Sequence, residues 1–182
     1  MTKVISLLGG PCAGKSTNAP YIFALLKSRG CRAELVTEYI KNWAYEGRKI
    51  SAYDQFYILG KQIRKESFLL DKVDYIVTDS PVWLCAYYAE EISPPLVKHG
   101  VEAAVQGYYH QTQTDGHEHI FVWVNRTEQY DSRDRYHSEE EALEIDKNLK
   151  PFLESRGVKL LEITSSLDFK DATKFVEELL NG

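Results

Sequence analysis

The segment LLGGPCAGKST, Leu7–Thr17, places two glycines, a lysine and a hydroxyl side chain at fixed spacing. Gly9 and Gly14 are separated by four residues, and Lys15 and Ser16 follow, which matches the pattern G-x-x-x-x-G-K-[ST]. Glycines allow the dihedrals and close approach that backbone N–H groups need to surround a phosphate chain. The predicted phosphate contacts are Gly9, Gly10, Pro11, Cys12, Ala13, Gly14, Lys15, Ser16 and Thr17.

The flanking sequence supports this interpretation of the glycines. The apolar run VISLL precedes them, and an amphipathic pattern over residues 15–30 follows, so the motif joins a buried strand to a helix. The positive end of that helix points at the bound phosphates. In this setting Lys15 reaches the β- and γ-phosphates and the Ser16 hydroxyl coordinates magnesium. The alternative, a glycine-rich turn that contains Gly-Lys-Ser by chance, does not predict this context.

Two acidic residues follow other apolar runs. Asp79 ends DYIVTD, at the position of a carboxylate that orders magnesium, although it could instead cap the next helix. Glu38 follows AELVT, where a carboxylate can accept the proton of an acceptor hydroxyl. A glutamate that starts a helix explains Glu38 equally well. We therefore predict Ser16 and Asp79 as magnesium ligands. The residues alone do not decide whether Glu38 is a catalytic base or a helix-starting glutamate.

Large side chains gather in the helical segment between residues 38 and 72. Aromatic rings stack on flat ligands, and glutamine amides read the edges of bases. Alternatively the segment forms a helical core, because Phe56, Leu59 and Ile63 have helical spacing. We expect most of the aromatic residues in the core, and we predict that Tyr39 and Gln62 contact the substrate. The set comprises Tyr39, Trp43, Tyr45, Tyr53, Gln55, Phe56, Tyr57 and Gln62.

Arginines cluster after the fourth apolar run, in the polar stretch of residues 126–137. Arg126, Arg133 and Arg135 carry planar guanidinium groups that bind phosphate oxygens at two points. A loop that carries them can close over ATP and exclude water, which would otherwise compete as acceptor. The alternative is a solvated charged loop, because acidic residues are interleaved with the arginines.

The elements that position these residues alternate along the chain. Apolar runs predict strands over 3–8, 33–37, 74–79, 119–125 and 158–164. Helical patterns cover 15–30, 38–70 with a break near 47–51, 82–91, 95–114, 138–157 and 168–182. This alternation predicts an α/β three-layer sandwich with a five-stranded parallel sheet. Ligands of such sheets bind beyond the carboxyl ends of the strands, where the residues singled out above lie.

Composition limits the class of protein. The chain has 182 residues, of which 43% are hydrophobic and 27% charged, as in a globular protein with a substantial core. No apolar run has the length of a membrane span or the features of a signal peptide. The three cysteines have no metal-type spacing and cannot all pair, which favours a cytoplasmic location. The net charge of −5 gives no overall attraction to nucleic acid, although a local basic patch stays possible.

Other motifs restrict the kind of nucleotide-binding protein. A GTPase predicts Asn-Lys-x-Asp after a strand, and the fourth strand is followed by VNRTEQ instead. A motor ATPase needs a longer chain and a second acidic residue beside Asp79, where the sequence has Ser80 and Pro81. A kinase is the class that these observations favour.

With these parts assembled, the chain resembles the nucleoside and nucleotide kinase group of P-loop proteins. It is most similar to small phage and bacterial AAA-type ATPase/kinase domains related to ribosylnicotinamide kinases. The resemblance covers most of the chain and is carried by GGPCAGKST, TEYIKNW, LGKQIRKE, VTDSP and SRDRYHSEEEALEID. It implies that Glu38 is the catalytic base and that Asp79 helps to hold magnesium. Many relatives have an arginine directly after the third-strand acid, where this chain has Ser80, so Arg133 or Arg135 must supply that charge.

The expected activity is therefore an ATP- and Mg2+-dependent transfer of the γ-phosphoryl group to a nucleoside or nucleotide-like acceptor. Two alternatives stay open: a kinase that acts on hydroxymethylated pyrimidines in phage DNA, and an ATPase switch without a small-molecule acceptor. We expect one domain over residues 1–182, with a helical acceptor-binding insertion at about 38–72 and an arginine lid at about 126–137. The basic residues that would hold DNA are Lys41, Arg48, Lys49, Lys61, Arg64 and Lys65.

Overall fold

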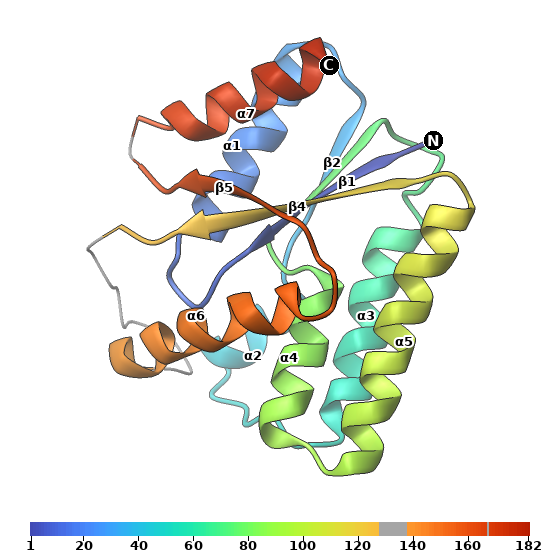
Figure 1. Ribbon diagram of the computed structural model, residues 1–182, viewed down its shortest axis with the longest axis vertical. Helices are drawn as coiled ribbons and strands as arrows, with labels where there is room; N and C mark the ends of the chain where they lie inside the picture. Colours follow the sequence, from blue (N-terminus) through green and yellow to red (C-terminus); the bar gives the residue numbers. More distant parts are fainter. Residues whose placement is uncertain (128–137, 167) are drawn as a thin grey trace.

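A five-stranded parallel sheet forms the centre of the molecule (Figure 1). The computed structural model describes residues 1–127, 138–166 and 168–182. The strand order is β2-β3-β1-β4-β5, with β1 in the middle. The predicted α/β class and all five predicted strands are confirmed. The strands are β1 (Lys3–Leu8), β2 (Ala33–Val36), β3 (Tyr75–Thr78), β4 (Glu118–Asn125) and β5 (Leu160–Thr164).

Helices cover both faces of the sheet (Figure 1). α1 (Lys15–Ser28) and α7 (Lys170–Asn181) pack together on one face. The other face is covered by α4 (Val82–Ile92), α5 (Pro95–Thr114) and α6 (Glu139–Glu154). α3 (Asp54–Ser67) packs on α4 and α5 and, together with the short α2 (Lys41–Tyr45), joins β2 to β3. No helix among the described residues is long and apolar enough to cross a membrane.

The strands are apolar on both sides because each side meets a helical layer. Ile5 and Leu7 pack toward α1 and α7, whereas Leu8 and Trp123 belong to the cluster under α4 to α6. All four are at least 95% buried. Continuous apolar runs of this kind are typical of parallel sheets with two covered faces.

The structure agrees with the sequence signals for helix α6 and for the buried face of helix α1. Ser138 is the N-cap of α6, its hydroxyl accepts a hydrogen bond from the Glu141 N–H, and the Glu141 carboxylate accepts one from the Ser138 N–H. The predicted capping box is therefore confirmed. The predicted apolar positions Ala19, Ile22 and Leu26 of α1 are fully buried.

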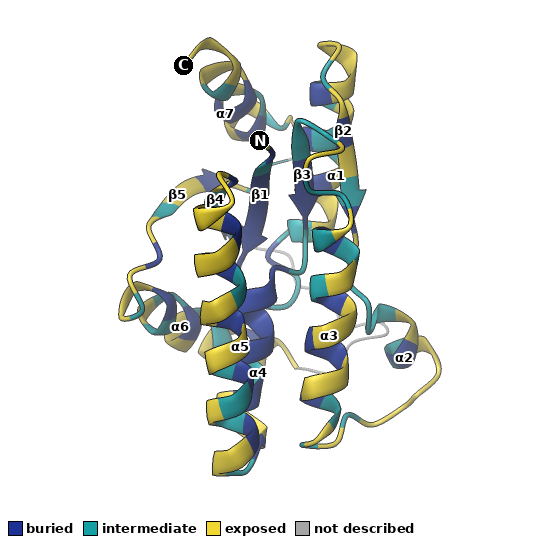
Figure 2. Ribbon diagram, turned by 90° about the vertical axis from the view of Figure 1, so that its right-hand side faces the viewer, coloured by how far each residue is buried: buried dark blue, intermediate teal, exposed yellow. Residues whose placement is uncertain are grey.

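The segment between β2 and β3 differs from the prediction in its buried face. Trp43 is buried, but Tyr45, Tyr53, Phe56 and Tyr57 are 44–66% exposed, so the expectation that most aromatics here lie in the core is wrong. Figure 2 shows that α3 presents one buried stripe and a largely exposed outer side. The buried residues of α3 are Gln55, Ile58, Leu59, Gln62 and Glu66.

The carboxyl ends of β1 and β3 form the point where the sheet topology reverses. The chain leaves β1 toward α1 on one face, and it leaves β3 toward α4 on the other face. The two loops therefore diverge and leave a crevice between them, which is where ligands bind in open α/β sheets. The phosphate-loop sequence follows β1, and Asp79 follows β3, so both lie at this crevice.

Candidate functional site

The loop between β1 and α1 has the backbone shape that its glycines predict. Gly9 has a φ of +145° and Gly14 has a φ of +94°. Residues other than glycine rarely adopt such positive φ values, because their Cβ clashes with the backbone. A Cβ on Gly9 would lie 3.1 Å from the Val124 carbonyl oxygen, and one on Gly14 would lie 2.1 Å from Ser165 Oγ. The glycines are therefore needed both for the turn and for the close packing of the loop on β4 and on the segment after β5.

Lys15 is held inside this loop. Its Nζ donates to the Gly9 carbonyl at 2.7 Å and to the Gly10 carbonyl at 2.8 Å. Burial lowers the pKa of the Lys15 ammonium, and the nearby carboxylates of Glu38 and Asp79 oppose that shift. The ammonium group is thus placed beside the predicted phosphate position, with two acidic side chains close to it.

An ion pair braces the loop from outside. Arg126, directly after β4, donates through Nε and Nη2 to Asp146 Oδ2 of α6 at 2.9 and 2.7 Å. The same Nη2 donates to the Pro11 carbonyl at 2.7 Å, and the Gly10 N–H donates to Asp146 Oδ1 at 2.5 Å. Arg126 was predicted to contact ATP, which stays a prediction, and in the structure it holds the phosphate loop through the Pro11 carbonyl. Asp146 was missed, because a single aspartate in a charged helix gives no signal in the sequence.

Glu38 and Asp79 lie at the ends of neighbouring strands, β2 and β3. Asp79 Oδ1 accepts a hydrogen bond from the Glu38 N–H at 3.1 Å. Burial raises the pKa of the Asp79 carboxyl, while Lys15, the Glu38 N–H and Lys41 act in the opposite direction. Neither acid caps a helix, since Pro81 is the N-cap of α4 and Ile40 that of α2. The N-cap alternative for Asp79 is therefore wrong, and Glu38 does not start a helix, because α2 begins at Lys41.

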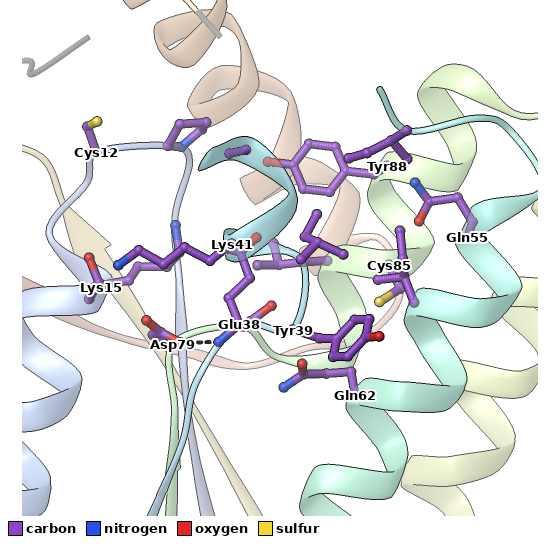
Figure 3. A pocket seen from close by; sticks show the side chains of 18 of the residues that line it. Cys12, Lys15, Glu38, Tyr39, Lys41, Gln55, Gln62, Asp79, Cys85 and Tyr88 are labelled. Atoms are coloured by element: carbon purple, nitrogen blue, oxygen red, sulfur yellow. Dashed lines mark hydrogen bonds between the residues drawn. The ribbon is translucent and has the colours of Figure 1, made fainter. Parts of the chain in front are cut away.

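A cavity of about 430 Å³ extends from the phosphate loop to α3. Figure 3 shows Lys15 and Cys12 at one end, Glu38 and Asp79 between, and Gln62 and Gln55 at the other end. Its volume falls within the range of small-molecule sites. The side chains of Ile40, Ile50, Ile58, Leu84, Cys85, Tyr88 and Ile92 supply much of the wall.

Both predicted substrate contacts line this cavity. Gln62 is 1% exposed and faces it from α3, and the Tyr39 hydroxyl is hydrogen-bonded to the Tyr57 hydroxyl at 2.8 Å. The lining also includes Gln55, a member of the same polar and aromatic set, and Lys41 and Lys49, which were predicted only as DNA contacts. Gln55 lies seven residues before Gln62, two helical turns away, so the spacing of the two glutamines was a usable signal.

The predicted lid residues Arg133 and Arg135 lie outside the described residues. The structure therefore brings residues of the phosphate loop, both acids and the two predicted substrate contacts together at one cavity, and Arg126 lies behind the loop at the Pro11 carbonyl. Lys41 lines the cavity as a further cation, together with Lys49. Figure 3 shows its side chain extending from α2 toward Lys15 and Asp79.

The fold and the loop define the class of protein, a P-loop NTPase. A family profile described as an AAA domain matches residues 4–170, and the chain belongs to that family. No curated protein sequence matches the chain.

Solved structures with the same fold include two of NadR protein. One, in complex with NR, has a TM-score of 0.72 and 16% sequence identity, and it covers 99% of this chain and 51% of that one. The other, in complex with NAD and AMP-PNP, has a TM-score of 0.66 and 13% identity, and it covers 99% of this chain and 49% of that one. This chain therefore spans about half the length of both NadR chains.

Proposed function

We propose that the protein is a kinase that transfers the γ-phosphoryl group of ATP to a hydroxyl of a nucleoside-like acceptor. The observation that carries the proposal is the continuity of the cavity, which runs from the phosphate loop, past Glu38 and Asp79, to the glutamines of α3. A hydrolase needs room for one water beside the phosphates. A cavity of about 430 Å³ with polar groups at its far end fits a second substrate better.

The residues divide the reaction between them. The acceptor hydroxyl oxygen forms a bond to the γ-phosphorus, and its proton passes to the Glu38 carboxylate. The bond from that phosphorus to the bridging oxygen breaks, and its electron pair leaves with ADP. Lys15 and the backbone N–H groups of residues 9–17 neutralise charge on the transferred group. Arg126 keeps the loop in shape through Pro11 and Asp146.

The proposed metal is Mg2+, held by Ser16 and Asp79. Ser16 lies in the first turn of α1 and Asp79 follows β3, and both line the cavity. Two protein oxygens suit Mg2+, because it binds through one or two protein ligands, waters and phosphate oxygens. When bound, the ion neutralises negative charge on the phosphates.

Lys41 is the proposed cation on the acceptor side. Ser80 stands where related kinases have an arginine, so a positive charge has to come from another element. Lys41 begins α2, lines the cavity and lowers the pKa of the Asp79 carboxyl by its charge. An ammonium at this position stabilises the equatorial oxygens as the phosphoryl group moves between donor and acceptor.

The acceptor class rests partly on the structural neighbours. A NadR structure contains NR, and the acceptor of this chain is proposed to be a nucleoside of that kind. The helical segment 38–72 is proposed as the acceptor-binding part of a single domain, and residues 126–137, with Arg133 and Arg135, as the lid. A cytoplasmic location fits these substrates.

The experiment is transfer of labelled γ-phosphate from Mg-ATP to separate pools. The pools are nucleosides, nucleoside monophosphates, nicotinamide riboside, and DNA with and without hydroxymethylated pyrimidines. Label in a small molecule supports the proposal, and Lys15→Ala should abolish it while the circular dichroism spectrum stays unchanged. Release of free phosphate alone, across all pools, contradicts the proposal and favours an ATPase switch.

One surface observation favours DNA as a second candidate acceptor. Lys61 lies 5.2 Å from the centre of the half-exposed Tyr57 ring and 6.0 Å from that of Tyr39. Cations interleaved with aromatic rings bind single-stranded nucleic acid through phosphates and stacked bases. This candidate predicts label on DNA in the same assay and binding that weakens steeply with salt.

A further inference from the structure

Buried polar side chains continue beyond the α3 end of the cavity. Gln55, Ile58 and Gln62 line the cavity, and Glu66 follows Gln62 by one helical turn on the same face of α3. Gln62 is 1% exposed and Glu66 is fully buried. Burying an amide and a carboxyl costs stability unless hydrogen bonds satisfy them, so this pair needs an explanation beyond packing.

Each of the two side chains has a polar atom without a partner. Among the residues that the structure describes, Gln62 Nε2 and Glu66 Oε1 are buried without a hydrogen bond of good geometry, although the Gln62 amide lies close enough to Glu66 to lower the pKa of its carboxyl. The other carboxyl oxygen, Glu66 Oε2, accepts one from the Tyr108 hydroxyl at 3.3 Å. Figure 3 shows the Gln62 amide beside Tyr39, at the end of the cavity away from Lys15. A ligand in the cavity therefore meets Gln62, with Glu66 behind it.

We propose that Glu66 is a positioning residue that, as a carboxylic acid, donates a hydrogen bond to the Gln62 amide oxygen and turns the Gln62 NH2 group toward the cavity. The NH2 group then donates to a carbonyl oxygen on the planar group of the acceptor. The acceptor class is thus a nucleoside whose ring carries a lactam or carboxamide carbonyl. This inference rests on the proposed function, because it assigns part of the same acceptor site.

The surroundings of Glu66 favour the acid form. Burial raises the pKa of the Glu66 carboxyl to about 8, and the Tyr108 hydrogen bond and the Gln62 amide only partly oppose that rise. Because Tyr108 donates to Oε2, the acid proton belongs on Oε1, the oxygen that has no other partner. At neutral pH the carboxyl group is therefore a donor on the side of the Gln62 amide, and a half-turn of that amide brings its oxygen to the Glu66 proton.

The neighbouring groups do not titrate in the same pH range. α4 contributes Cys85, whose thiol pKa burial raises to about 12, and α5 contributes Tyr108 and Tyr109, whose pKa values burial raises well above 10. Burial lowers the pKa of His119, which contacts both tyrosine rings, to about 4. Lys65, next to Glu66 on α3, donates to the Thr37 carbonyl instead. A change near pH 8 at this end of the cavity therefore reports Glu66.

Ionisation of Glu66 should reverse the Gln62 amide. A carboxylate accepts hydrogen bonds only, so above about pH 8 it pairs with the Gln62 NH2 group and leaves the amide oxygen facing the cavity. That oxygen accepts from an amino group and repels a carbonyl. The site should thus prefer a ring carbonyl below about pH 8 and a ring amino group above it. A role of Glu66 in packing alone would not cause this change.

The test is calorimetric binding of matched nucleosides in the presence of AMP-PNP and Mg2+, at pH 6.5 and pH 9. Uridine and cytidine differ by a carbonyl and an amino group at one ring position, and inosine and adenosine differ in the same way. We expect the carbonyl member of at least one pair to bind about tenfold more tightly at pH 6.5, in line with one hydrogen bond and one avoided mismatch. The preference should vanish or reverse at pH 9.

Variants separate positioning from packing. Glu66→Gln keeps a neutral donor that does not titrate, so the carbonyl preference should persist at both pH values. Tyr108→Phe removes a hydrogen bond that lowers the pKa of Glu66, so the pH midpoint of the preference should move upward. Glu91→Gln, at an exposed carboxylate of α4, is the matched control and should behave as the wild type.

The outcomes distinguish this inference from the proposed function. The inference is overturned if the preference for the carbonyl nucleosides is the same at both pH values in the wild type and in Glu66→Gln. It is also overturned if none of the four nucleosides binds. Transfer of label to a small molecule under those conditions would leave the proposed function standing. Conversely, pH-dependent binding without any label transfer would support the nucleoside site while contradicting the kinase.

Discussion

At the scale of single residues, Glu38 and Asp79 differ although they follow neighbouring strands. Asp79 is tied to the backbone, because its Oδ1 accepts a hydrogen bond from the Glu38 N–H. The positive charges of Lys15 and Lys41 counteract the rise that burial causes in the pKa of its carboxyl. Glu38 supplies the backbone N–H of that bond, and its carboxylate, like that of Asp79, opposes the lowering of the Lys15 pKa. The Asp79 carboxylate is therefore tied to the backbone that carries Glu38, and both acids act on Lys15.

Glu38→Gln should lower kcat by about 100-fold or more, because the amide cannot take the proton of the acceptor hydroxyl. ATP affinity should stay within about twofold, since the amide keeps the size of the side chain and the backbone N–H bond to Asp79. Steady-state transfer assays together with ATP titration by calorimetry measure the two effects separately. Unchanged transfer would remove Glu38 as the base.

Lys41→Met should reduce kcat by about 100-fold with little change in ATP affinity, because the charge acts on the transferring group rather than on bound ATP. Lys41→Arg should restore part of the rate. The matched control is Lys159→Met, at an exposed lysine far from the cavity lining. The readout is the affinity for MgADP with aluminium fluoride, a mimic of the transferring phosphoryl group. Equal affinity in Lys41→Met and the wild type would exclude the role.

At the scale of elements, sequence patterns predicted what depends on local chemistry. The strand ends, the phosphate loop and the capping box of α6 each follow from neighbouring residues, and the structure confirms them. The buried face of α3 was predicted wrongly, because Phe56 and Tyr57 look more like core residues than Gln55, Gln62 and Glu66 do. Only the packing of α3 against α4 and α5 decides which stripe is covered, and that packing is a long-range contact.

α6 illustrates the same limit on prediction, because its contact with the phosphate loop spans more than 130 residues of sequence. Asp146→Ala should leave the Gly10 N–H without this acceptor and release Arg126 from its ion pair. We expect the ATP dissociation constant to rise about tenfold and unfolding free energy to fall by about 1–3 kcal/mol. Glu162→Ala, which breaks the more exposed pair with Lys150, should cost about 1 kcal/mol or less. Equal effects of the two variants on ATP binding would contradict the bracing role.

At the scale of the whole molecule, the sheet places the site at its topological reversal, and the helices beyond β2 and β3 enlarge it. The P-loop end follows from one motif in the sequence. The acceptor end is assembled from α2, α3 and α4, whose lining residues lie between residues 38 and 92 of the chain. No single motif connects them, so Lys41 was predicted only as a DNA contact and Gln55 only as a member of a larger set, while Lys15 and Ser16 were assigned directly.

Glu66 also links the acceptor site to the stability of the whole fold. Its pKa is about 8 in the folded protein against an ordinary value of 4.5, so the folded state favours the protonated form. The stabilising contribution is fully present below about pH 4.5 and is lost as the pH rises toward 8. Glu66→Gln does not titrate and escapes this loss. Its unfolding free energy should therefore rise relative to the wild type between pH 5 and pH 8, and the difference should level off above pH 8.

Urea denaturation at pH 5, 6, 7, 8 and 9 measures this difference at each step. Taking the difference between variant and wild type cancels the titration of all other groups, because those groups are common to both proteins. Glu91→Gln removes an exposed carboxyl and should give a difference that stays nearly constant over the same range. A constant difference for Glu66→Gln as well would mean that Glu66 is already ionised in the folded protein. The Gln62 amide would then present its oxygen to the cavity at neutral pH, and acceptors with a ring amino group would be the better ligands.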